Sequence, residues 1–75
     1  MLYDVIIEGI LHHCETPLES LGELYKWASL WGASHVRENY SDYPEEMQNT
    51  IGKHGEWMDM AQLEALIYEY NTTRI

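Results

Sequence analysis

Hydrophobic residues in the first fourteen positions recur at intervals of three and four. The series consists of Tyr3, Ile6, Ile7, Ile10, Leu11 and Cys14. An α-helix places residues with this spacing on one side, so the pattern predicts a helix from about Leu2 to His13. The β-branched run Val5, Ile6 and Ile7 also suits a buried strand, and this alternative stays open.

A second helix is predicted to begin at Pro17. Thr16 is a suitable N-cap, and Glu19 follows it at the spacing of a capping box. Proline is favoured at the first helical position, where its missing N–H has no partner to lose. Gly32 is placed to end this helix. The expected inner face consists of Leu18, Leu21, Leu24, Tyr25, Ala28 and Trp31.

The middle of the chain has a helical stripe that a proline interrupts. The stripe consists of Val36, Tyr40, Tyr43, Met47 and Ile51. Because proline breaks a helix, the region is predicted to form one helix over Ser34–Tyr40 and another over Pro44–Gly52. Asp42 or Tyr43 is expected to cap the second of these.

The last helix has the clearest start signal in the chain. Asp59 and Gln62 have the spacing of a capping box, and Met58 can pack on Leu63 as a hydrophobic staple. The expected inner face consists of Met60, Leu63, Leu66, Ile67 and Tyr70, and Asn71 with the two Thr residues after it is expected to end the helix. The sequence thus predicts an all-α fold, a compact bundle of four to five short helices in a single domain over residues 1–75.

Composition adds a strong negative charge to this picture. Thirteen acidic residues and four basic ones give a net charge of −9, yet 45% of the 75 residues are hydrophobic, with three Trp and six Tyr. This apolar content predicts a folded chain rather than a disordered acidic tail. We expect such a surface to repel nucleic acid and anionic lipid and to attract basic protein surfaces. A core this small also leaves room for stabilisation by a partner or a homodimer.

Neither a targeting segment nor a membrane span is predicted. Asp4 and Glu8 interrupt the apolar N-terminus, and no basic flank precedes it. No run approaches the roughly 20 apolar residues that a span needs. Cys14 is the only cysteine, so an internal disulfide is excluded and a cytoplasmic location in a reducing compartment is expected.

The carboxylates are the main candidates for function. If residues 2–13 are helical, Asp4 and Glu8 lie one turn apart, and Glu15, Glu19 and Glu23 continue the same spacing. Like charges at this spacing repel, and a surface that retains them resembles a sparse nucleic-acid backbone. The hypothesis is an acidic recognition surface that mimics nucleic acid. The alternative is a solvated face that only maintains solubility.

The cluster of His12, His13 and Cys14 does not have the spacing of a metal site. Adjacent helical residues point about 100° apart, and structural zinc usually takes two spaced pairs of ligands. A site at His12, Cys14 and His35 is a minor alternative. Cys14 lies in an acidic segment, which raises a thiol pKa, so nucleophilic catalysis is not expected. We therefore predict no cofactor and no enzymatic activity.

Two aromatic residues are expected outside the core. Trp27 and Tyr68 lie off the inner faces of their helices, where aromatic side chains are favoured anchors of protein interfaces. Trp31 and Trp57 are expected to fill the core.

Two functions follow from these patterns. The first is a small inhibitor, of the type used by phages and mobile elements, that binds the basic, nucleic-acid-facing surface of a larger protein such as a nuclease. Its contact residues would be Asp4, Glu8, Glu15, Glu19, Glu23, Trp27 and Tyr68. The second is a structural or regulatory subunit that forms a homo-oligomer or caps a helical partner through apolar contacts, its acidity serving solubility alone.

Overall fold

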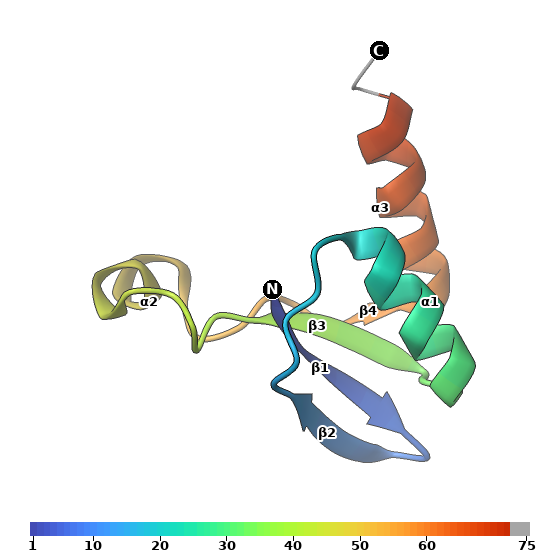
Figure 1. Ribbon diagram of the computed structural model, residues 1–75, viewed down its shortest axis with the longest axis horizontal. Helices are drawn as coiled ribbons and strands as arrows, with labels where there is room; N and C mark the ends of the chain where they lie inside the picture. Colours follow the sequence, from blue (N-terminus) through green and yellow to red (C-terminus); the bar gives the residue numbers. More distant parts are fainter. Residues whose placement is uncertain (73–75) are drawn as a thin grey trace.

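The protein has a small α/β fold, so the predicted all-α bundle is wrong. The computed structural model describes residues 1–72. A four-stranded antiparallel sheet has the strand order β2-β1-β3-β4. Helices α1 and α3 lie side by side against one face of this sheet, while α2 stands apart from it (Figure 1).

A β-hairpin occupies the segment that was predicted to be the first helix. Strands β1 (Leu2–Ile7) and β2 (Ile10–Cys14) pair through a two-residue turn. The turn residues Glu8 and Gly9 have φ angles of 53° and 78°, as a type I′ turn requires. The β-branched run of residues 5–7 therefore forms a strand because β3 and the helices pack around it, a context that local periodicity does not contain.

The predicted helix over residues 34–40 is also wrong. Strand β3 (His35–Asn39) lies between β1 and the short strand β4 (Met58–Asp59). Val36 is the fully buried residue of β3, and it pairs with Val5 on one side and Met58 on the other. The apparent helical stripe therefore joins residues from a strand, a loop and a separate helix.

Helix α1 (Leu21–Trp31) begins four residues later than predicted. Ser20 is the N-cap, and its hydroxyl accepts a hydrogen bond from the Glu23 amide. The predicted cap fails because the Leu18 amide donates to the Met1 carbonyl, which holds the preceding segment as a loop. The predicted end is confirmed, since Gly32 takes the left-handed conformation with φ of 70°.

The other two helices follow the prediction more closely. Helix α2 (Glu45–Ile51) has Pro44 at its N-cap position, instead of Asp42 or Tyr43, with no side-chain cap bond. Helix α3 (Met60–Thr72) has the predicted capping box. The Asp59 amide donates to Gln62 Oε1 at 2.9 Å, and the Gln62 amide donates to Asp59 Oδ1 at 2.8 Å.

The hydrophobic core lies between the sheet and the pair α1 and α3. Its buried residues are Tyr3, Val5, Leu18, Leu24, Ala28, Ala33, Val36 and Leu63. The predicted inner faces are right in part: Leu24, Ala28 and Leu63 are buried, whereas Trp31 and Leu66 are each 38% exposed and Tyr70 is 55% exposed. The C-terminal half of α3 extends past α1 (Figure 1), and residues 68–72 of this half are exposed.

Residues 40–57 between β3 and β4 form an arm that carries α2 away from the sheet (Figure 1). None of the α2 residues is buried. An isolated bridge between Asn39 and His54 closes the base of the arm. Within residues 1–72, no helix has the length and apolar character needed to cross a bilayer.

Candidate functional site

A row of hydrogen-bonded polar side chains crosses the sheet. Asp4 pairs with His13 in β2 and with Arg37 in β3, so all three point to the face opposite the core. His13 Nδ1 lies 2.7 Å from Asp4 Oδ1, and Arg37 Nε donates to Asp4 Oδ2 at 2.8 Å. Asn39 Nδ2 lies 3.2 and 3.3 Å from the two oxygens. The Arg37 guanidinium stacks 4.2 Å from the centre of the Trp57 ring.

This row encloses Asp4, which is 1% exposed. Burial alone would raise the pKa of Asp4, but hydrogen bonds from His13, Arg37 and Asn39 outweigh it and hold the pKa below its usual range. Among the described residues, no buried side-chain nitrogen or oxygen lacks a partner. The Asp4 carboxylate therefore has its hydrogen-bond partners within the fold, and it is not accessible to the binding partner that the sequence predicted for it.

The remaining nominated acids do not form one helical stripe. Glu8 lies at the tip of the hairpin, while Glu15 and Glu19 lie in the loop before α1. Only Glu23 is helical, and its carboxylate accepts a hydrogen bond from the Glu19 amide at 2.9 Å. All four are nevertheless exposed. The acidic surface is real, although the helix that was expected to organise it is absent.

Most of the negative charge lies on the surface without a basic neighbour. Eleven acidic residues are exposed: Glu8, Glu15, Glu19, Glu23, Asp42, Glu45, Glu46, Glu56, Asp59, Glu64 and Glu69. Within residues 1–72, the only Lys or Arg within 4.0 Å of a carboxylate is Arg37, which pairs with buried Asp4. Arg37 is thus engaged by the buried Asp4. The exposed carboxylates of the described residues remain available to bind a basic partner.

A hollow of about 530 Å³ adjoins this acidic surface at the start of α1. Its wall comes from α1, the end of α3, β3 and the N-terminal residue. The lining residues are Met1, Glu19, Ser20, Leu21, Gly22, Glu38, Ile67, Tyr70 and Asn71. Two carboxylates beside apolar side chains suit the stem and charged head of a lysine or arginine from another protein.

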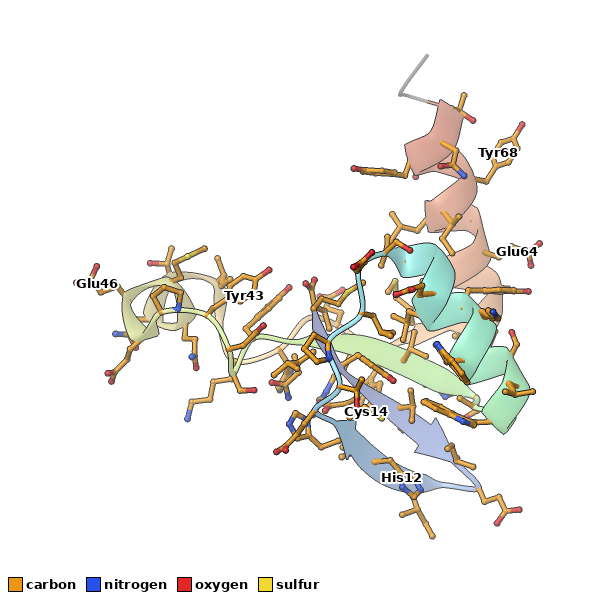
Figure 2. The ribbon with its side chains drawn as sticks, viewed as in Figure 1. His12, Cys14, Tyr43, Glu46, Glu64 and Tyr68 are labelled. Carbon is orange, nitrogen blue, oxygen red and sulfur yellow. The ribbon has the colours of Figure 1, made fainter. Side chains whose placement is uncertain are left out.

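Exposed aromatic residues lie at two separate places. Trp27 is 38% exposed and stacks on Trp31, whose ring stacks in turn on buried Tyr3. Tyr68 is 75% exposed on α3, and its side chain points away from the sheet (Figure 2). The predicted exposure of Trp27 and Tyr68 is confirmed, whereas Trp31 was wrongly placed in the core and Trp57 covers Arg37 on the opposite face of the sheet.

An apolar surface that the sequence analysis did not identify lies where β2 meets the C-terminal half of α1. We call it the apolar end, and it consists of Ile10, Trp27, Leu30 and Trp31 together with Leu11, which lies on the other face of β2; all five are exposed. Neither of the segments that supply it, residues 9–14 and 24–37, contains an aspartate or glutamate. That uninterrupted absence of carboxylates in so acidic a chain was the available signal.

The histidines and the cysteine form no metal-binding group in the described residues. No group of three His, Cys, Asp or Glu residues is placed to hold an ion within residues 1–72. His12 and His35 pair with adjacent residues of β1, Val5 and Ile6, so they point to opposite faces of the sheet. Burial raises the pKa of the Cys14 thiol, which disfavours the reactive thiolate.

Comparisons with known proteins give no match to a protein-family model, a curated protein or a solved structure. The candidate sites therefore rest on the geometry described above.

Proposed function

We propose that the protein is a small acidic antagonist or regulator that binds the basic, nucleic-acid-facing surface of a larger protein in a reducing, cytoplasmic setting. The observation that carries this proposal is the set of eleven exposed carboxylates that have no Lys or Arg of residues 1–72 within 4.0 Å, in a chain of net charge −9. Such a surface attracts a basic partner over long range and accelerates encounter. The chain needs no catalytic group for this role.

The proposed contact centres on the hollow at the start of α1. Glu19 and Glu38 would receive a basic side chain of the partner, while Leu21 and Ile67 would pack on its aliphatic stem. Exposed Glu23 lies beside Glu19, whose amide it accepts a hydrogen bond from, and exposed Glu15 precedes Glu19 in the same loop. Tyr68 on α3, outside the lining of the hollow, would supply a separate apolar anchor. Asp4 has no part in the contact, because its carboxylate is enclosed.

The test is binding to a panel of purified DNA-binding proteins and nucleases, with duplex DNA as competitor. We expect the DNA to compete, and the association rate to fall steeply between about 50 and about 500 mM salt. Binding that is unaffected by both salt concentration and competing DNA would contradict the proposal.

A pair of charge reversals locates the contact. Glu19→Lys should weaken binding by about tenfold or more, because it places a like charge against the basic partner. Glu46→Lys changes the net charge equally but lies on the arm (Figure 2), so it should reduce only the long-range attraction. Equal effects of the two variants would exclude the hollow as the contact.

A second candidate function is a subunit that associates through apolar contacts. Its supporting observation is the apolar end, where five large hydrophobic residues are exposed on segments without carboxylates. In this case partner binding would be insensitive to salt, and the acidity would serve solubility only.

A further inference from the structure

Strand β2 is an outer strand whose free edge carries unpaired backbone groups. The Ser34 amide donates to the Ile6 carbonyl at 2.9 Å, so the even-numbered residues of β1 direct their peptide groups toward β3. The odd-numbered residues, among them Val5, then bond to their β2 partners, including His12. The alternate β2 residues, Leu11 and His13, therefore direct their N–H and C=O groups outward.

The side chains along this edge are unusually apolar for an exposed strand. Ile10 is 61% exposed on the face that carries the helices, and Leu11 is 50% exposed on the other face. Beside Ile10 lies an open hollow of about 250 Å³. Its lining residues are Val5, Ile7, His12, Cys14 and Trp31. Figure 2 shows His12 and Cys14 on this outer strand. Natural edge strands usually carry charges or bulges that prevent pairing, and residues 10–14 carry no acidic or Lys/Arg side chain.

The distribution of charge indicates which partner would pair with the free edge of β2. A basic partner gains nothing from segments without carboxylates, whereas two copies of a chain with net charge −9 repel each other wherever their carboxylates meet. Residues 9–14 and 24–37 bring no carboxylate to the apolar end, so two copies that meet there oppose no acid from these segments. We propose that it is a homodimer interface, in which the β2 strands of two copies pair antiparallel and join their sheets into one.

The pairing that uses the outward groups has its two-fold axis at His12. Leu11 of one copy then lies opposite His13 of the second copy, and their outward peptide groups bond to each other. Ile10 lies opposite Cys14 of the second copy, on the face where Trp31 borders the hollow. The exposed isoleucine of each copy thus meets the apolar hollow of the other, and the contact occurs twice by symmetry.

This interface goes beyond the proposed antagonist function, and its test needs no other partner. Sedimentation velocity of the full chain from about 1 to about 500 µM should show a shift from the 8.8 kDa monomer to a species of twice that mass. Amide hydrogen exchange should show Leu11 and His13 becoming protected as the dimer forms. A single monomeric species across the whole range would overturn the proposal.

Two matched pairs of variants assign the contact to the strand edge. Leu11→Pro removes the outward N–H and should abolish the dimer, whereas Leu11→Ala shortens the same side chain and should weaken it less. Ile10→Glu should raise the dimer dissociation constant by at least about tenfold, because each new carboxylate would be placed against the apolar hollow of the other copy. Met47→Glu, an equal change at an exposed residue of α2, should leave it unchanged.

The remaining outcomes are decisive. A dimer that survives both Leu11→Pro and Ile10→Glu, or one in which the Leu11 and His13 amides exchange as fast as in the monomer, would show a different interface and refute this one. Circular dichroism of each variant confirms folding, and Ile10→Glu decides the result if Leu11→Pro does not fold.

Discussion

The two faces of β1 are stabilised by different interactions. On the face that carries the helices, Tyr3 and Val5 are buried among apolar side chains of α1, α3 and β3. On the opposite face Asp4 is equally buried, but among the polar groups of His13, Arg37 and Asn39. The first face gains stability from the area removed from water, the second from charge-assisted hydrogen bonds that compensate a desolvated carboxylate.

A thin sheet can therefore bury side chains on both faces with only one apolar core. A side chain removed from the apolar face leaves a cavity, whereas a partner removed from the polar face leaves a buried charge. The two faces should therefore differ in their response to mutation and to pH.

The largest expected effect comes from Arg37→Met, which leaves the Asp4 carboxylate buried without its cation. The free energy of unfolding, measured by urea titration, should fall by about 3–5 kcal/mol. The double variant Asp4→Asn with Arg37→Met removes the uncompensated charge and should recover much of this loss. A cost below about 1 kcal/mol for the single variant would show that the pair contributes no more than an exposed ion pair.

On the apolar face, Leu63→Ala should cost about 2–5 kcal/mol, because a fully buried side chain is replaced by a cavity. Leu66→Ala changes the same residue type on the same helix at a position that is 38% exposed, so its cost should be clearly smaller. Thermal and urea unfolding measure both. Equal costs would mean that α3 does not pack on the sheet through Leu63.

The smallest of the three effects is a pH dependence specific to the polar face. Because the pKa of Asp4 is lower in the folded protein than in the unfolded chain, its contribution is complete above the unfolded pKa. It is lost as the pH falls through the folded pKa. Unfolding free energies measured from neutral to acid pH should show this loss in wild type and in Leu63→Ala. In Asp4→Asn the decline should be shallower, and an identical decline would assign the acid sensitivity to other groups.

Local signals predicted the elements whose ends are fixed by neighbouring residues. The capping box at Asp59 and Gln62 and the left-handed Gly32 are interactions within a few residues, and both are confirmed. Strand β1 has no such local marker. Its pairing with residues 35–39 connects segments about thirty positions apart, and this pairing together with the β2 hairpin makes residues 2–7 a strand.

The candidate site was predictable in its charge and not in its arrangement. The net charge follows from the composition alone. The exposure of Trp27 and Tyr68 follows from their positions around their helices, which the packing of the helices leaves exposed. The role of Asp4 depends on side chains supplied by β2 and β3. A single aspartate inside the apolar segment LYDVII was a signal for such a network, but its interpretation required the register of the sheet.

The arm that carries α2 has a consequence for how this scaffold can be altered. Its base is closed by the Asn39 and His54 bridge, and α2 contributes no buried residue to the core. Segments of other length or sequence can therefore be grafted between these two residues while the strands on either side keep their register. The sheet and its two packed helices would then serve as a fixed scaffold, and the arm as the segment that is varied, as in engineered display scaffolds.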